Sequence, residues 1–403
     1  MRLHMTKRLS PDAEKLISLC LASYVSGSRT EDRFWEAQTD ALVAKIFRQG
    51  NQATLDAALE RLQQNHSGAY SVLAETTDAH SESLTLSHEN GQWDAVLIAA
   101  PVLAWTRYTI PLGPLKPDTV NALQAHLQAH ILADGVRLAM APYLYSIDQL
   151  PEQQIETYRL TQQFAQAALE RRPIQLPLHS RELPEIAPVL ADPRFLLAVA
   201  AAPAGQALFR WQEKENGMRI ERRDCLKQWA AQGGANFAQA LPGCELECLL
   251  PDAYHAACRT ADEKIRPHTL RTAIRYLKDT LAPNTSGLRA VIGGFGEHRV
   301  DEYRIGFTQR GDNTVLYGIV WPLYGHEDIA ALAAEQDETA NSPLDDIIAL
   351  LKEANIVDIR RHAGRFDPEY CEDCNGPLYA NPLGEIVHAE MPADIEPTQP
   401  HFH

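Results

Sequence analysis

Two apolar runs of similar sequence determine the expected fold, Ala95-Val-Leu-Ile-Ala-Ala-Pro101 and Phe195-Leu-Leu-Ala-Val-Ala-Ala-Ala-Pro203. Short, continuous apolar runs of this kind are typical of strands that are buried on both faces. Both runs end in Ala-Ala-Pro, and each is followed by an arginine and an aromatic residue, at Arg107-Tyr108 and Arg210-Trp211. We therefore expect two related units, each led by a central strand.

The segments after the two runs have the same predicted order of helix, strand and helix. The helices are expected at 117–132 and 151–171 in the first unit, and at 222–241 and 253–281 in the second. The strands between them are expected at 136–145 and 246–250. Pro267 should break the last helix, because proline lacks the N–H that an α-helix uses.

A third and looser copy is Leu288–Gly296, followed by expected strands at 300–308 and 314–323. The copies begin about 90 to 100 residues apart, which is longer than the repeat of a solenoid. This internal repeat favours strand-helix-strand-helix units on one or two sheets. A final helix is expected at 343–354 and a strand at 356–360.

The N-terminal segment is expected to be helical. Ser10 is a suitable N-cap and Pro11 occupies the favoured first position of a helix over 11–24. Two further helices should follow, from Thr30 to the residue before Gly50 and over 52–64. Residues 76–90 are polar and acidic, which predicts a linker into a hairpin that turns at Asn90-Gly91.

These patterns predict an α/β (α+β) fold in four parts. They are a helical cap over 1–75, a first α/β unit over 91–172, a second α/β unit with added strands over 194–363, and a zinc-knuckle-like tail over 364–403. Five prolines between Arg172 and Pro193 mark the boundary between the two α/β units, because proline is excluded from helix interiors and central strands.

Composition narrows the class of protein. The 403-residue chain is 45% apolar, and its 53 acidic and 37 basic side chains give a formal net charge of −16. Non-specific nucleic-acid binding depends on Lys and Arg, so this charge argues against a nucleic-acid partner. No apolar run reaches the ~20 residues that span a bilayer, and no signal peptide is evident. Seven scattered cysteines do not suggest a disulfide framework. We expect a soluble cytoplasmic protein without a membrane partner.

The most specific chemical signal lies in the tail, in Tyr370-Cys-Glu-Asp-Cys-Asn-Gly-Pro-Leu378. Cys371 and Cys374 have the Cys-x-x-Cys spacing with which two thiolates bind one tetrahedral zinc, and His388 follows at the distance found in Cys-Cys-His sites. The stretch between them resembles a ribbon hairpin, but no second Cys-x-x-Cys follows. A redox pair or two unmetallated thiols are the alternatives.

The fourth ligand of this expected structural zinc must come from elsewhere. His401 is the first candidate, and His403, His362 or a carboxylate are the others. A catalytic zinc would instead leave one position open to water.

A second candidate is a cofactor-binding turn over Gly293-Gly-Phe-Gly-Glu-His-Arg299. Its glycines, Gly293, Gly294 and Gly296, would let the backbone approach an anion, with His298 and Arg299 as partners. The turn matches neither the dinucleotide fingerprint nor a P-loop, and a flexible connection between strands is the simpler interpretation.

Two other clusters contain metal-ligating residue types. The first comprises Cys244, Cys248, His255 and Cys258. The second is the pair His126 and His130 on one helix. Buried cysteines and a solvated helix face are the simpler explanations of these clusters.

The whole chain resembles an uncharacterised bacterial family, a domain of unknown function of about 400 residues. The resemblance rests on the Ala-Ala-Pro strand with its arginine-aromatic pair, on Pro251-Asp-Ala-Tyr, and on the Cys-x-x-Cys tail that ends in His388-Ala-Glu-Met-Pro392. It covers nearly all residues and implies a cytoplasmic bacterial protein. The family contributes no activity that could be assigned to this chain.

Two classes of function remain open. The first is a module that binds a small ligand or a protein partner, with a structural zinc in the tail and a homo-oligomer as a further expectation. The second is a metal-assisted hydrolase or transferase with a polar pocket formed by residues 293–299 and His326. No Gly-x-Ser-x-Gly elbow or His-Glu-x-x-His helix occurs, so no catalytic residue can be assigned.

Overall fold

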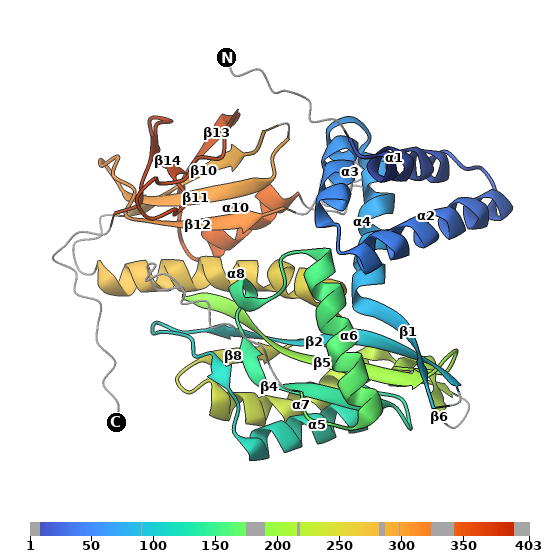
Figure 1. Cartoon of the computed structure of the whole chain (residues 1–403). Helices are drawn as coiled ribbons and strands as arrows, with labels where there is room; N and C mark the ends of the chain where they lie inside the picture. The colour runs from blue at the N-terminus through green and yellow to red at the C-terminus, as the bar shows by residue number, and fades with distance from the viewer. Residues whose placement is uncertain are drawn as a thin grey trace.

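The computed structural model describes residues 9–89, 91–174, 190–215, 218–281, 287–297, 299–323 and 342–390. These residues form a mixed α/β structure with a helical N-terminal part, a seven-stranded sheet and a separate four-stranded sheet (Figure 1). No helix among them combines the length and the apolar character needed to cross a bilayer.

Four helices make up the N-terminal part: α1 (Pro11–Tyr24), α2 (Arg29–Gln49), α3 (Gln52–Asn65) and α4 (Ser67–Glu82). Ser10 caps α1 as expected, since its side chain accepts a hydrogen bond from the Ala13 N–H. The helices pack around their own apolar cluster, which includes Leu16, Ile46 and Leu55.

Helix α4 corrects the expectation of a linker over 76–90. The helix continues to Glu82 and crosses residue 75, where the helical cap was expected to end. Its buried positions are Ala69, Leu73, Thr77 and Ser81. They follow a helical period, but three of the four side chains are small or polar, so hydrophobicity alone does not reveal the pattern. The predicted hairpin follows directly, from β1 (Ser83–His88) into β2.

The two apolar runs lie side by side at the centre of the seven-stranded sheet. β2 (Gly91–Trp105) and β5 (Ala191–Pro203) pair antiparallel along their length, with Leu97 opposite Val199. The strand order is β1-β2-β5-β4-β3, and β8 and β9 also pair with β2. The remaining strands of this sheet are β3 (Gly113–Pro114), β4 (Arg137–Tyr145), β8 (Glu245–Cys248) and β9 (Asp252–Ala253).

Helices cover both faces of this sheet, because alternate residues of each central strand point to opposite sides. Val96, Ile98 and Ala100 of β2 pack with α5 (Pro117–His130) and α7 (Arg222–Ala240). Ala95, Leu97 and Ala99 pack with α6 (Gln154–Glu170) and α8 (Tyr254–Thr280). The order strand-helix-strand-helix therefore occurs twice on one sheet, while a duplication as its origin stays a prediction.

Helix α8 connects the two sheets and is not broken at Pro267. Ala257, Ala261 and Ile265 belong to the core of the first sheet, whereas Leu270 and the residues after it belong to the core of the second. Pro267 lies inside the continuous helix, where the change from one core to the other occurs. Proline costs a helix about 3 kcal/mol, and the packing of both halves offsets this cost.

The four-stranded sheet has the order β12-β11-β10-β13. Its strands are β10 (Leu288–Phe295), β11 (Glu302–Gln309), β12 (Tyr317–Pro322) and β13 (Asp358–Phe366). β10 is antiparallel to β11 and parallel to β13. The C-terminal half of α8 and α10 (Pro343–Glu353) cover one face. The strands after Leu288 thus form a sheet with a core of its own and do not extend the first sheet.

Short elements complete the described chain: η1 (Ile147–Gln149), η2 (Arg210–Gln212), β6 (Lys214–Glu215), β7 (Met218–Arg219), β14 (Tyr379–Ala380) and β15 (Ile386–Val387). β14 and β15 form a hairpin in the tail that packs on the face of the second sheet opposite α8.

Candidate metal centre

The Cys-x-x-Cys stretch forms a tight turn whose backbone closes on itself. The Cys371 N–H donates to the Gly376 carbonyl at 2.8 Å, and the Asn375 N–H donates to the Cys371 carbonyl at 2.9 Å. Asn375 has a left-handed φ of 55°, which asparagine tolerates better than most residues. The Gly376 N–H lies 3.4 Å from Cys374 Sγ, and a Cβ at Gly376 would crowd that sulfur. The glycine lets the backbone fold over the Cys374 thiol.

The β14–β15 hairpin brings His388 to this turn. Its reversal is stabilised by Asn381, whose Oδ1 accepts hydrogen bonds from the Leu383 and Glu385 N–H groups. His388 follows β15 directly, and its Nε2 lies 3.2 Å from Cys374 Sγ. The ligand atoms of Cys371, Cys374 and His388 all lie within 4.8 Å of one another. The three side chains are close enough to bind one metal ion.

The environment of Cys371 favours the thiolate form that a metal binds. Hydrogen bonds from the Cys374 and Asp373 N–H groups lower the pKa of the Cys371 thiol below its usual value. Burial instead raises the pKa of the thiols of Cys20, Cys225, Cys244, Cys248 and Cys258. The thiol with a lowered pKa therefore belongs to the Cys-x-x-Cys pair.

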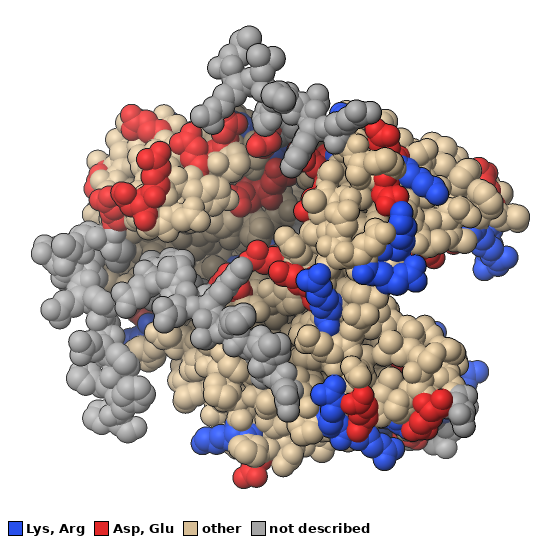
Figure 2. All heavy atoms as spheres, viewed as in Figure 1, with Lys and Arg blue, Asp and Glu red and all other residues tan. Residues whose placement is uncertain are grey.

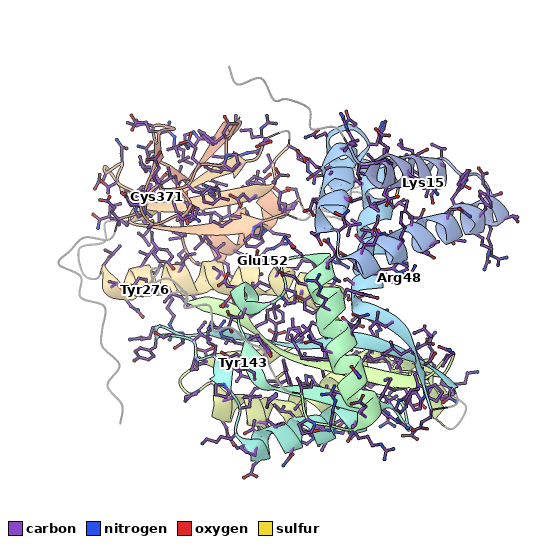
Figure 3. All side chains as sticks on the ribbon, viewed as in Figure 1. Lys15, Arg48, Tyr143, Glu152, Tyr276 and Cys371 are labelled. Atoms are coloured by element: carbon purple, nitrogen blue, oxygen red, sulfur yellow. The ribbon has the colours of Figure 1, made fainter. Side chains whose placement is uncertain are left out.

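The surface around the turn is acidic. The exposed acidic residues of the described part of the tail are Asp367, Glu369, Glu372, Asp373, Glu385 and Glu390. Figure 2 shows acidic side chains over the part of the molecule that contains the second sheet and the tail. Figure 3 shows Cys371 at this sheet and away from helix α8, on which Tyr276 is labelled. This charge favours a cation over an anion at the site.

The described residues do not supply a fourth ligand. Among the described parts of residues 9–390, no further histidine, cysteine or carboxylate brings a ligand atom within 4.8 Å of those of Cys371, Cys374 and His388. His362 Nε2 is 2.9 Å from the Asn381 carbonyl oxygen and so has a partner of its own. The candidates His401 and His403 lie outside the described residues.

Arg304 is a residue of this region that the sequence analysis missed. Its side chain is fully buried, and it donates to the Glu369 and Leu378 carbonyl oxygens, which lie on either side of the turn. The available signal was an arginine between Tyr303 and Ile305, within a stretch where charged residues are rarely buried without partners.

The first residues of the expected anion-binding turn belong to a strand. Gly293 and Gly294 lie inside strand β10 and are buried. A Cβ at Gly293 would crowd the Phe366 ring, and one at Gly294 would crowd Val300. These glycines make room for apolar side chains, and anion binding by this stretch stays a prediction.

Gly296 and Arg299, at the other end of the 293–299 stretch, have local roles in the backbone bend after β10. Gly296 has a φ of 155°, and a Cβ there would overlap the Arg299 carbonyl oxygen, so the glycine is required by the bend. Arg299 forms an exposed ion pair with Asp301 at 3.1 Å. His298 and His326 lie outside the described residues, so the pocket that they were expected to help form stays a prediction.

The other cysteine cluster is divided between the two faces of the first sheet. Cys248 packs with α5 and α7, whereas Cys258 packs on the opposite side with α6. Side chains on opposite faces of a sheet cannot share one ion. His126 and His130 are ring neighbours, with centroids 5.9 Å apart, and no third ligand joins them among the described residues.

A buried polar cluster between α4 and α8 has the residue types of a catalytic triad. Ser81 Oγ is 2.7 Å from His255 Nε2, but His255 Nδ1 is 3.9 Å from Asp78, beyond hydrogen-bonding distance. Ser81 is fully buried, and its hydroxyl also donates to the Asp78 carbonyl of its own helix. A serine without access to substrate cannot act as a nucleophile, so this cluster joins α4 to α8.

Comparison with known proteins assigns the chain to a family. A family model described as "Protein of unknown function (DUF2863)" matches residues 1–402. The chain belongs to this family. The match confirms the resemblance to an uncharacterised family of about 400 residues. No curated protein and no solved structure matches the chain.

Proposed function

We propose that this member of the DUF2863 family binds one zinc ion through Cys371, Cys374 and His388. The convergence of these three ligand atoms within 4.8 Å carries the proposal. The two cysteines come from one turn, and the histidine comes from beyond a hairpin of its own. An ion held in this way cross-links the turn to the end of β15.

The donor set supports zinc more than other common metals. Two thiolates and one imidazole are soft and intermediate ligands, which suit zinc and exclude magnesium or calcium as the resident ion. The lowered pKa of Cys371 supports binding at neutral pH, because the metal competes with a proton for the sulfur. His401 would complete a Cys₂His₂ set.

A structural role for the zinc fits the position of the site. The tail packs Ala380 and Ile386 onto Val291 and Phe295 of the second sheet. Short segments of this kind contain little apolar surface of their own, so a metal cross-link can supply most of their stability. The zinc would hold the tail in the conformation that covers the sheet.

For the chain as a whole we favour a cytoplasmic bacterial module that binds a small ligand or a protein partner. All seven cysteines are free thiols in the structure, which suits a reducing compartment. The net charge of −16 opposes a nucleic-acid partner. A homo-oligomer would be compatible with these features.

The alternative is a metal-assisted hydrolase or transferase. One observation favours it: only three ligands come together among the described residues, and catalytic zinc sites keep one position for water. The ligand count therefore decides between a structural and a catalytic ion.

Metal analysis of the full chain, purified without a histidine tag, tests the proposal. We expect about one zinc per chain in the wild type and none in the double variant Cys371→Ser, Cys374→Ser. Cys244→Ser is the matched control, because this thiol lies outside the cluster, and it should keep the zinc. Absence of metal from the wild type would refute the site.

Cobalt substitution then gives the ligand set. A tetrahedral spectrum that changes in His401→Ala would support the structural role. A spectrum that is insensitive to His401→Ala and responds to added anions would indicate an exchangeable water, and it would support the enzyme.

A further inference from the structure

Arg304 lies on the face of the second sheet that the tail covers. Its neighbours Ile305 and Phe307 belong to the core beneath α8 and α10. Side chains alternate along a strand. Positions 304 and 306 therefore face the side of the sheet opposite α8 and α10. A Cβ on Gly306 would lie 3.4 Å from the Ala380 carbonyl oxygen, which shows how closely the tail approaches there.

The Arg304 guanidinium contacts both ends of the metal-binding turn. Nη1 donates to the Glu369 and Leu378 carbonyl oxygens, each at 2.7 Å. These two residues also bond to each other, since the Leu378 N–H donates to the Glu369 carbonyl at 3.1 Å. One arginine therefore binds the backbone both before and after the turn that contains Cys371 and Cys374.

The surroundings of this cation depend on the tail. The guanidinium carbon lies 4.4 Å from the centroid of the Phe295 ring and 5.0 Å from that of Tyr370, the residue before Cys371. Nε donates to Glu302 at 2.6 Å, and Glu302 is its carboxylate partner within the sheet. Nη2 has no hydrogen-bond partner among the described residues. If the tail left the sheet, Arg304 would lose both carbonyl acceptors and one aromatic ring.

Burying the Arg304 cation costs free energy unless acceptors replace the water that it loses. When the tail docks, its two carbonyl acceptors offset the cost of burying Arg304, and Arg304 in return holds the turn in the shape that brings the cysteines together. A metal ion that stabilises the closed turn must therefore also stabilise the docked tail. Docking of the tail must in turn strengthen metal binding, because coupling between two sites is reciprocal.

We propose that Arg304 is a positioning residue that couples metal binding by Cys371, Cys374 and His388 to docking of the tail on the second sheet. Metal binding closes the turn and supplies the acceptors for Arg304. Metal release loosens the tail and exposes the apolar sheet face that includes Val291 and Phe295. This inference rests on the proposed zinc site.

Zinc affinity of the full chain tests the coupling, measured by competition with a chromophoric chelator. Arg304→Lys keeps the positive charge but replaces the guanidinium, whose Nη1 donates to both carbonyl groups while Nε donates to Glu302, with a single ammonium group that cannot reproduce this geometry. We expect its zinc affinity to fall by about 10- to 100-fold, as for other residues that orient metal ligands. The cobalt spectrum of the saturated variant should match the wild type, because the ligands themselves are unchanged.

Arg289→Lys is the matched control. Arg289 lies on β10 of the same sheet and pairs with Asp358 of β13 at 3.1 Å, without a hydrogen bond to the described part of the tail. Its zinc affinity should stay within about twofold of the wild type. Equal affinity of Arg304→Lys and wild type would overturn the inference while leaving the zinc site intact. Absence of zinc from both wild type and control would instead refute the proposed function.

Hydrogen exchange on the wild-type protein decides the question if Arg304→Lys does not fold. Peptides that cover β11 and residues 378–387 should exchange faster after the metal is removed by chelation. Faster exchange confined to residues 371–376 would show that the sheet does not sense the metal, and it would overturn the coupling.

Discussion

Glu82 is expected to make the stability of this protein fall as the pH rises towards neutrality. Its carboxylate accepts a hydrogen bond from the His255 N–H at 2.7 Å, at the N-terminus of α8. Burial is the largest cause that raises the pKa of Glu82, to about 7 from 4.5, and the charges of Asp78 and Asp252 add to it. The hydrogen bond from the His255 N–H and the Arg259 cation lower the pKa and oppose this rise.

The sign follows from proton linkage. The folded protein holds the Glu82 proton more tightly than the unfolded chain does. Protonated Glu82 therefore makes its full contribution to the free energy of unfolding below about pH 4.5, and this contribution is lost as the pH rises through about 7. At 1.36 kcal/mol for each pKa unit, the full difference is about 3 kcal/mol. Glu82 is partly exposed, so we expect about 1–3 kcal/mol.

Glu82→Gln tests this expectation. Glutamine can still accept the hydrogen bond from His255, but it adds no charge beside Asp78. At pH 8 the variant should be more stable than the wild type by about 1–3 kcal/mol, and at pH 4.5 the two proteins should differ little. Urea denaturation at both pH values measures the difference.

Comparing Glu82→Gln with the wild type cancels the contribution of neighbouring titratable groups to the pH dependence of stability. Burial lowers the pKa of His255, which by itself would make stability fall at acidic pH, but both proteins share this effect. Glu75→Gln, at an exposed position of the same helix, is the control and should change stability by less than about 0.5 kcal/mol at either pH. A Glu82→Gln variant that is equally destabilised at both pH values would refute the reasoning.

Three further predictions concern packing and charge. A Cβ at Gly318 would overlap the Tyr379 ring, so Gly318→Ala should destabilise the protein by about 1–3 kcal/mol or more and speed proteolysis of the tail. Gly364→Ala, where a Cβ meets nothing within 4 Å, is its control, and equal effects of the two changes would contradict the packing argument. Pro267→Ala should raise the free energy of unfolding by about 1–2 kcal/mol, since it restores a helical N–H, and a loss of stability in denaturation would argue that the proline is required. No salt-sensitive binding of DNA or RNA is expected near 0.15 M salt, and micromolar retention on either would count against the charge argument.

Local signals predicted the elements well where the side chains that carry the pattern are apolar or form caps. Ser10 and Pro11 predicted the start of α1, and the structure confirms it. The polar period of α4 and the continuity of α8 through Pro267 were not predictable in this way, because packing against other elements stabilises both.

The candidate metal site was predictable in part, because its residues also lie within one short segment. Cys371, Cys374 and His388 are close in sequence, and a turn and a hairpin bring them together without help from distant segments. Arg304 contacts the turn from more than 60 residues away in sequence, so nothing local indicates its role. Gly293 and Gly294 were expected in a turn but lie in strand β10, because the Phe366 and Val300 side chains beside them leave no room for a Cβ.

The sequence by itself determined the buried strands, most helix positions and the three residues that cluster as candidate metal ligands, because each depends on periodicity or spacing within a short segment. Only the tertiary structure decided that β2 and β5 pair with each other, that α8 serves two cores, and that a buried arginine connects the tail to the sheet. These features depend on which apolar faces meet and on which buried charges find acceptors. Both are properties of the folded chain as a whole.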